Sequence, residues 1–268
     1  MNTSYAELHC HTNYSFHDGA SSVEELLVRS KELGHRALAI TDHDNLCGAM
    51  HFAQVANSLD VQAITGAEVT LTDGSHLTLL AETRQGYSNL SRIISYSYIS
   101  GERRDPGFDL KHMPELAEGL ILLTGCRQGR LPILLEQGHQ ARAQDQLRQY
   151  LDWFGTSNVF VELQQNLVQG DTRRNRQLVQ LARETGVEVV ATNNVHYHVR
   201  ERHQLHECLV SIKHLKSLEE SHRERRANSE FYLKSPQEME ELFSDYPEAV
   251  TTTLRIAERC SSFDLTKD

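Results

Sequence analysis

The sequence of 268 residues lacks any apolar run long enough to span a membrane. Its first residues, Met-Asn-Thr-Ser-Tyr-Ala-Glu, have neither the basic start nor the apolar stretch of a signal peptide. The five cysteines show no even, tight spacing, which argues against a disulfide framework and for reduced thiols. These absences together predict a cytoplasmic protein with no membrane partner.

Positive charge is also scarce, since the formal net charge is −10. A broad phosphate-binding surface requires an excess of Lys and Arg. If DNA is a substrate, metals in a pocket or another domain must therefore supply the local positive charge. Histidine, in contrast, is abundant, with 15 in the chain. We interpret this excess as the one functional signal in the composition.

Strand and helix signals alternate along the chain. Ser22 and Glu25 form a capping box for a helix that ends at Gly34. Asp73-Gly74 is a favoured hairpin turn, and we expect a mobile polar loop at 101–107. The predicted strands lie before His9 and at 37–41, 61–68, 76–81, 120–123, 159–163 and 187–191, and residues 69–72 lead into the hairpin turn. The predicted helices lie at 21–34, 47–59, 89–99, 131–136, 141–154 and 173–186.

The repeated βα pattern favours parallel strands with helices outside them. A single βα-barrel of roughly 250 residues fits this length. We therefore predict an α/β fold with a barrel at about 4–215. A charged, solvated connector follows at about 217–230, and a C-terminal helical extension at about 235–262.

Residue types that bind metals follow several predicted strands. Because side chains alternate along a strand, His9 and His11 point to one face and can hold one cation together. His43, Glu68 and His196 each follow another apolar stretch. The C-terminal strand ends of a βα-barrel surround one pocket. Imidazoles and carboxylates gathered there predict a catalytic metal site.

Each of these signals has an alternative interpretation when taken alone. His-x-His also fits an exposed polar strand face, and Cys126 also fits a small buried hydrophobe. Glu68 must be either solvated or neutralised by a cation, because an unpaired buried charge is costly. The joint occurrence of these residues favours the metal site. Other histidines fall in a polar helical region and are interpreted as surface residues: His198, His203, His206, His214 and His222.

The motifs resemble those of the polymerase and histidinol phosphatase (PHP) family. They are His-x-His, Thr-Asp-His-Asp, Gly-Ala-Glu, the histidine of Ser-His-Leu-Thr-Leu-Leu-Ala, Thr-Gly-Cys and Ala-Thr-Asn-Asn-Val-His-Tyr. They follow the family's order and spacing from about residue 6 to 260. Residues 15–20 and 124–129 resemble in particular the N-terminal PHP domain of bacterial C-family DNA polymerases of the polymerase III alpha type, in their error-prone branch.

This resemblance implies a distorted, TIM-like barrel of seven βα units, forming a single PHP domain over residues 1–268. It also implies two to three divalent ions at the strand C-termini and phosphoester hydrolysis, which polymerase-linked members can show as 3′→5′ exonuclease activity. Imidazole, thiolate and carboxylate ligands together suit zinc, with manganese or iron as alternatives where oxygen ligands dominate. The implied partners are a phosphate ester or DNA 3′ end as substrate and a polymerase catalytic body, in cis or in trans, in DNA replication or repair.

Carried over position by position, the resemblance assigns a role to each motif residue. His9 and His11 would bind a first ion, and Glu68 would bridge the first and second ions. These three residues would act in catalysis through the bound metals. His76 and Cys126 would complete the ligands of the second ion.

The third ion would be held by Asp18, His43 and His196. His17 is an alternative to Asp18, because stand-alone members of the family place a histidine near this position. Asn194 stands where many active members have an aspartate. Its amide oxygen can still coordinate the first ion but brings no negative charge, so this ion is expected to bind more weakly.

Arg127, just past Cys126, could steady a substrate phosphate as a bidentate donor, or it could be an exposed arginine at a helix start.

Two functions of different class remain. One is a metal-dependent phosphoesterase, most simply a nuclease that trims a DNA 3′ end. The other is a catalytically weak or inactive structural module that supports an error-prone polymerase body. Asn194 favours the second function, and retention of the other ligands favours the first.

Overall fold

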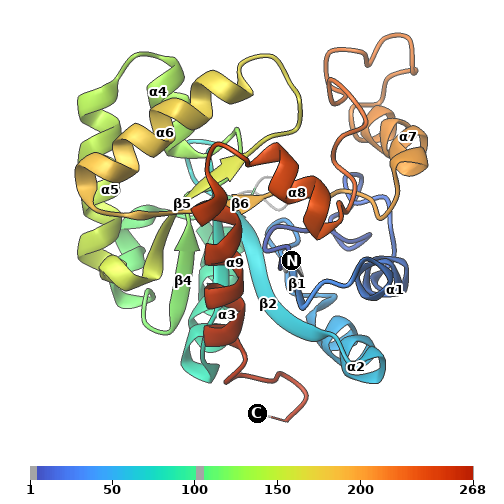
Figure 1. The fold of residues 1–268 in the computed structure, drawn as a ribbon, viewed down its shortest axis with the longest axis horizontal. Coiled ribbons are helices and arrows are strands. Elements are labelled where there is room, and N and C mark those ends of the chain that lie inside the picture. Colours follow the sequence, from blue (N-terminus) through green and yellow to red (C-terminus); the bar gives the residue numbers. More distant parts are fainter. Residues whose placement is uncertain (1–4, 101–105, 268) are drawn as a thin grey trace.

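The computed structural model describes residues 5–100 and 106–267, and it shows helices around one curled sheet (Figure 1). Within the described residues this sheet has six strands in the order β1-β2-β3-β4-β5-β6. The strands are β1 (Ala37–Ile40), β2 (Gln62–Thr70), β3 (His76–Ala81), β4 (Leu120–Leu123), β5 (Val159–Gln164) and β6 (Glu188–Thr192). The helices are α1 (Val23–Leu33), α2 (Ala49–Leu59), α3 (Arg84–Ser100), α4 (Arg130–Glu136), α5 (Gln140–Phe154), α6 (Asp171–Thr185), α7 (His203–Lys213), α8 (Pro236–Leu242) and α9 (Pro247–Cys260). The predicted α/β class is confirmed.

One strand breaks the parallel pattern that the βα repeat favours. β3 runs antiparallel to β2 and to β4, whereas the other neighbouring strands are parallel. The predicted turn at Asp73-Gly74 explains the reversal, because a parallel pair needs a much longer crossover. Gly74 has a φ of 78°, which glycine adopts without a steric penalty. The reversal places His76, the first residue of β3, opposite Thr70 at the end of β2.

Residues 5–11 join the two edges of the sheet. Ala39 N donates to Glu7 O at 2.8 Å beside β1, and Val195 N donates to His9 O at 2.8 Å beyond β6. The prediction of a regular strand here is wrong, since the segment forms only isolated bridges. Side chains replace part of the ladder: His9 N donates to the Glu7 carboxylate at 3.0 Å. The result is a distorted barrel, and the count of seven βα units stays a prediction.

The first helix follows the local signals in the sequence. Ser22 Oγ accepts from Glu25 N at 3.3 Å, and Glu25 Oε2 accepts from Ser22 N at 2.9 Å, which confirms the capping box. Gly34 ends the helix with a φ of 77°. This helix packs on β1, whose end leads into His43, through a hydrophobic cluster with α2. Its buried apolar residues are Val23, Leu26 and Leu27.

The C-terminal helical extension predicted at about 235–262 consists of two helices, α8 and α9. Residues 243–246 separate α8 from α9, which begins at Pro247, since proline lacks an N–H and fits the first turn of a helix. α9 packs against the barrel (Figure 1), and Ala6 N donates to Thr253 Oγ1 at 3.2 Å. Residues 217–230, all within the described part, contain no regular helix or strand.

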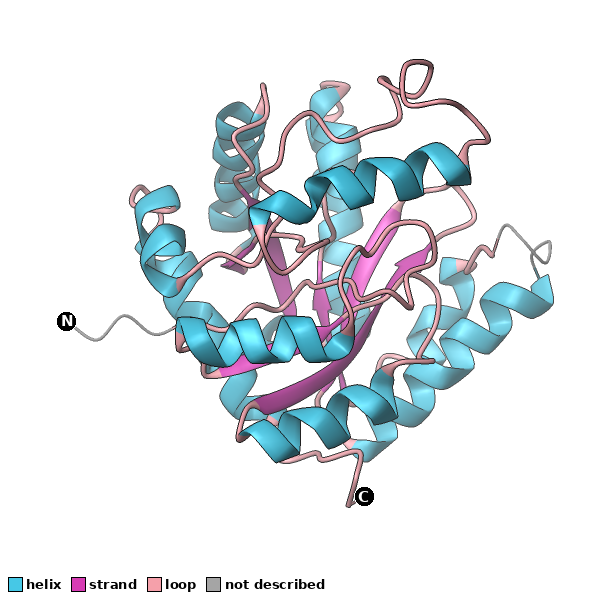
Figure 2. Cartoon of the chain, turned by 90° about the vertical axis from the view of Figure 1, so that its right-hand side faces the viewer, coloured by secondary structure: helices cyan, strands magenta, loops and turns pink. Residues whose placement is uncertain are grey.

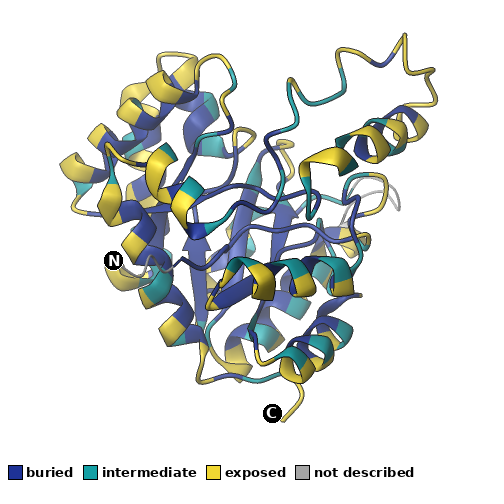
Figure 3. Cartoon of the chain, turned by 45° about the vertical axis from the view of Figure 1, so that its right-hand side comes forward, coloured by how far each residue is buried: buried dark blue, intermediate teal, exposed yellow. Residues whose placement is uncertain are grey.

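The helices lie outside the sheet, and the strands between them are buried (Figures 2 and 3). Within 5–100 and 106–267, no helix is long and apolar enough to cross a membrane. The loop predicted at 101–107 lies mostly outside the described residues.

His35 connects the turn after α1 to two other parts of the chain. Its ring packs edge-on against Tyr5 with centroids 5.6 Å apart, and its Nε2 donates to Lys234 O at 2.8 Å. Burial lowers the pKa of His35 from 6.5 to about 4. The folded state therefore keeps this imidazole neutral.

We expect His35→Gln to remove part of the acid sensitivity of the fold. The folded pKa lies below the unfolded value, so the contribution of His35 is present above about pH 6.5 and is lost as the pH falls toward 4. The loss should approach about 3 kcal/mol. Urea denaturation at several pH values measures it, with the exposed His139→Gln as control. Identical pH dependence in wild type and His35→Gln would contradict the prediction.

Candidate metal centre

The predicted metal-binding residues come together at one end of the sheet. His43 follows β1, Glu68 lies near the end of β2, Cys126 follows β4 and His196 follows β6. His76 joins them because β3 is antiparallel, so its first residue lies beside the end of β2. The topology therefore explains why residues far apart in sequence meet.

Glu68 lies at the centre of this cluster, with 1% of its side chain exposed. Its Oε1 lies 3.6 Å from His9 Nε2 and 3.1 Å from His76 Nδ1. Its Oε2 lies 3.4 Å from His11 Nε2 and 3.2 Å from His43 Nδ1. Burial alone would raise the pKa of Glu68, but the imidazoles of His76 and His43 hold this pKa well below its usual value. Glu68 is therefore a buried, ionised carboxylate.

Contacts at Nδ1 orient the imidazole rings of His9 and His11. His9 Nδ1 contacts Glu162 Oε1 at 2.6 Å, and His11 Nδ1 contacts Ser15 Oγ at 3.1 Å. These contacts leave the Nε2 atom of each ring facing Glu68, where neither Nε2 makes a hydrogen bond to any residue that the structure describes. Glu68 Oε1 likewise makes none. An imidazole fixed through one nitrogen, with the other nitrogen free, is typical of a metal ligand. The donor set fits a divalent ion.

The charges around these rings also suit a cation. Burial lowers the pKa of His11 to about 4, so its ring is neutral at pH 7 and its lone pair is available. Burial would lower the pKa of His9 as well, but Glu162 and then Glu68 raise it to about 10. The two carboxylates thus favour a positive charge beside His9, which a bound cation would supply in place of a proton.

A second carboxylate, Asp18, gathers another group of imidazoles. Its Oδ2 lies 3.0 Å from His43 Nε2 and 3.4 Å from His196 Nε2, and its Oδ1 lies 3.2 Å from His206 Nε2. Burial would raise the pKa of Asp18, but hydrogen bonds from neighbouring imidazoles, among them His206 and His43, hold it well below its usual value. The neighbouring His17 is exposed and lines a different pocket. Of the two sequence candidates, the structure brings Asp18 into the cluster.

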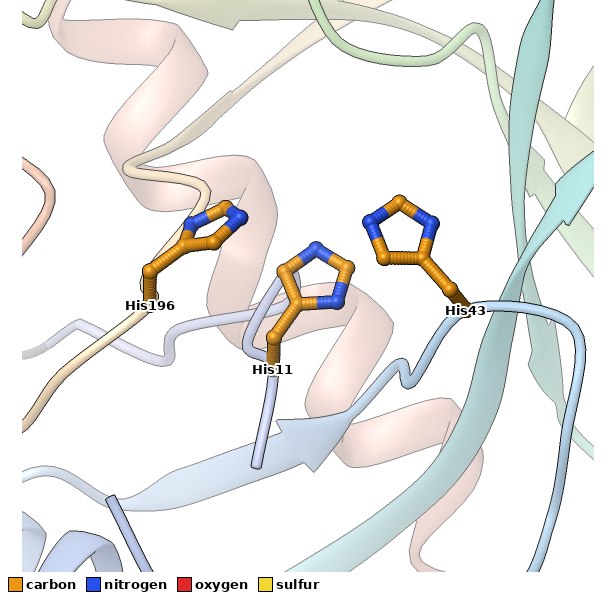
Figure 4. A group of neighbouring side chains, drawn as sticks. All are labelled: His11, His43 and His196. Carbon is orange, nitrogen blue, oxygen red and sulfur yellow. The ribbon is translucent and has the colours of Figure 1, made fainter. Parts of the chain in front are cut away.

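The two groups form one continuous centre. His11 lies between His43 and His196 (Figure 4), with ring centroids 4.4 Å and 4.5 Å away. His43 contacts both carboxylates, through Nδ1 to Glu68 and through Nε2 to Asp18. Charge at one carboxylate therefore acts on the other through a single imidazole.

The three remaining predicted residues line the same cavity, which has a volume of about 510 Å³. Cys126 Sγ lies 3.8 Å from His76 Nδ1, and burial, with a smaller effect of Glu68, raises the pKa of the thiol well above its usual value. Asn194 has a φ of 49°, which asparagine tolerates better than most residues. Its Oδ1 is buried and makes no hydrogen bond to the residues in 5–100 and 106–267. Arg127 is exposed at the wall of the cavity.

The prediction that His206 is a surface residue is wrong. Only 2% of this residue is exposed, because the face of α7 that carries it also buries Val210. The spacing of His206 and Val210, one helical turn apart, is the sequence signal that could have revealed this burial. His214 and His222 are exposed as predicted, whereas His198 and His203 are half-buried.

The connector predicted to be solvated contributes one side chain to the centre. Arg226 Nη2 contacts His196 Nε2 and lies 3.8 Å from Asp18 Oδ1. Burial and then the charge of Arg226 lower the pKa of His196 well below its usual value, so this imidazole is neutral. A run of charged residues gives no local signal for such a position.

Two buried acidic residues are absent from the sequence motifs. Glu162 accepts from Gln164 Nε2 at 2.9 Å and from Gly125 N at 3.1 Å, besides its contact with His9. Glu7 accepts from Tyr5 OH at 2.8 Å, and burial raises its pKa to about 7. Glu162 could have been found from sequence, because an acidic residue inside the apolar strand Val-Phe-Val-Glu-Leu is the signal that also marks Glu68.

Residues 7–166 match the family model of the PHP domain. The chain is 39% identical over 273 residues to an error-prone DNA polymerase of Symbiobacterium thermophilum and 38% identical over 272 residues to a DNA polymerase III subunit alpha of Treponema pallidum. These alignments cover 96% of this chain but 25% and 23% of the relatives, so the chain spans about a quarter of their length.

A similar fold occurs in a solved structure from Bifidobacterium adolescentis, named as a candidate metal-dependent phosphoesterase. The two chains are 14% identical, and the match covers 73% of this chain and 88% of the other with a TM-score of 0.52. This likeness is one of fold, and it agrees with the sequence matches. The chain belongs to the PHP domain family.

Proposed function

We propose that this domain is a metal-dependent phosphoesterase whose substrate is a phosphodiester at a DNA 3′ end. One observation carries the proposal: His9 Nε2, His11 Nε2 and Glu68 Oε1 are buried and make no hydrogen bond within the described part of the chain, and these three residues offer ligand atoms within 4.8 Å of one another. Such atoms are costly to bury without partners, and a cation among them would satisfy all three. The family, the polymerase names of the relatives and the fold of the candidate phosphoesterase support the same function.

The ligands divide into three sets in this proposal. His9, His11 and the amide oxygen of Asn194 would hold a first ion, and Glu68 would be shared between this ion and a second. His76 and Cys126 would complete the second set, and Asp18, His43 and His196 would hold a third ion. The mixture of imidazole, thiolate and carboxylate makes zinc the metal we propose, with manganese or iron as alternatives.

When bound, adjacent divalent ions polarise phosphoryl oxygens and lower the pKa of a bound water toward neutrality. The chain itself fixes the ligands and the substrate. Glu162 and Ser15 hold the rings of His9 and His11 so that each Nε2 faces Glu68. Arg127, exposed at the cavity wall, can donate two parallel hydrogen bonds to a substrate phosphate.

A second candidate function is supported by Asn194. Its neutral amide leaves the first ion with fewer anionic ligands, which favours a metal-bearing structural module over an enzyme. In that case the domain would stabilise the body of an error-prone polymerase. In the relatives, the region that matches this chain is only about a quarter of the protein.

The first test concerns Glu68. We expect the purified wild-type chain to hold two or three divalent ions, and Glu68→Gln to lose most of them, because the amide cannot bridge two cations as an anion. The wild-type chain should also lose thermal stability on chelation, by about 3 kcal/mol if metal is present at 100 times its dissociation constant. Elemental analysis and thermal melts with and without EDTA measure both effects.

The control for this test is Glu240→Gln, which removes an exposed carboxylate from α8. Its metal content and its response to EDTA should equal those of wild type. Unchanged metal content in Glu68→Gln would show that Glu68 is not a bridging ligand. Less than one ion per wild-type chain would count against the whole metal centre.

The second test separates enzyme from scaffold at Asn194. Asn194→Asp adds a negative charge in a partly desolvated pocket, where attraction to a divalent cation is poorly screened. We expect tighter binding of the first ion and a measurable gain in hydrolysis of a phosphodiester and of 3′-recessed DNA. Asn57→Asp adds the same charge at an exposed position and should change neither. A fully metallated Asn194→Asp protein with no hydrolysis would favour the structural module.

A further inference from the structure

The Asp18 end of the centre already holds a positive charge. Asp18, His196 and His206 offer ligand atoms within 4.8 Å of one another, which is the spacing of a metal site. Arg226 extends from the connector into this group. Its Nη2 lies 3.8 Å from Asp18 Oδ1 and contacts His196 Nε2. A guanidinium thus lies among the atoms that would hold a divalent ion.

The hydrogen bonds of His196 show which of its ring nitrogens carries the proton and which carries the lone pair. Nδ1 lies 2.7 Å from the carbonyl oxygen of Asn194 and must donate to it. In the neutral ring Nε2 then has the lone pair, and Arg226 Nη2 donates to it. The same lone pair would coordinate a metal through Nε2. Arg226 and a metal ion therefore compete for one acceptor.

Arg226 is held in this position by its surroundings. Its guanidinium carbon lies 4.3 Å from the ring centroid of Phe231, a distance typical of a cation–π contact. The backbone of Phe231 is fixed in turn, since His196 N donates to Phe231 O at 2.8 Å. The connector is also anchored by Asn228 Nδ2, which donates to Asn166 O at 2.8 Å. Arg226 therefore lies in a segment of the connector that hydrogen bonds hold against the barrel.

We propose that the Arg226 guanidinium takes the place of a divalent ion at Asp18, His196 and His206. This inference rests on the proposed metal centre but changes its composition. With Arg226 in place, Asp18 is neutralised by a built-in cation, and the chain holds ions only around Glu68. The guanidinium keeps the positive charge that a third ion would supply, and it makes this charge independent of metal concentration.

Counting bound metal tests the proposal. The full chain is equilibrated by dialysis against saturating free Co²⁺, and cobalt per chain is measured by elemental analysis. We expect Arg226→Met to bind one ion more than wild type, because the substitution removes the competing guanidinium but keeps an apolar chain against Phe231. Arg226→Gln is a second variant, and circular dichroism verifies that both are folded.

Two controls locate the additional ion. Arg225→Met removes a neighbouring arginine that lines the same cavity but pairs with Glu207 at 2.9 Å, so its cobalt content should equal that of wild type. Adding His206→Ala to Arg226→Met should return the content to the wild-type number. An equal cobalt content in wild type and in folded Arg226 variants would overturn the proposal, and so would a gain that survives loss of His206.

A different outcome of the same experiment would contradict the proposed function. A wild-type chain that binds no cobalt around Glu68 would contradict the metal-dependent phosphoesterase. A gain of one ion on removing Arg226 would still support the inference drawn here, because the comparison is between variant and wild type. No gain overturns the inference whatever the wild-type number is.

Discussion

The Glu68 carboxylate is buried among imidazoles, and a buried charge is stable only with close compensating partners. Its two oxygens lie within 3.6 Å of nitrogens from His9, His11, His43 and His76. Those rings come from the N-terminal segment, from the end of β1 and from the start of β3. The path of the chain at this end of the barrel, including the reversal of β3, serves to bring them together.

The two carboxylates of the centre have different surroundings. Glu68 faces two imidazole nitrogens that have no hydrogen-bond partner among the described residues, and its environment fits added cations. Asp18 is 13% exposed and has an arginine beside it in addition to three imidazoles. His43 contacts both carboxylates, so a charge bound at one end of the centre is felt at the other. One cavity thus contains a carboxylate whose surroundings fit an added cation and a carboxylate that already has a guanidinium beside it.

Prediction from sequence succeeded where the signal is local. The capping box at Ser22 and the turn at Asp73-Gly74 depend on a few neighbouring residues, and both occur as expected. The strand predicted before His9 failed because side chains, among them the Glu7 carboxylate, take backbone groups that a ladder would pair. These side-chain contacts to the backbone depend on the tertiary structure and have no local signal in the sequence.

The same distinction applies to the site. Apolar strands followed by His43, Glu68 and His196 could be recognised because a strand end is visible in sequence. The positions of His206 and Arg226 depend on how α7 and the connector fold back over the barrel, which no local pattern specifies. Glu162 is different, since its burial in an apolar strand is visible in the sequence but lies outside the family motifs.

The closure of the barrel by residues 5–11 has a consequence for the order of folding. Asn193 N donates to the Glu7 carboxylate across 186 residues of sequence, whereas the β2–β3 hairpin pairs neighbours in the chain. Contacts between distant residues form late, because they must overcome a larger loop-closure entropy. During synthesis the hairpin can form early, but the contacts of Glu7 and His9 with residues 193–195 can form only after residue 195 has left the ribosome. Closure of the barrel is therefore one of the last steps of folding, and the nascent barrel stays open for most of its translation.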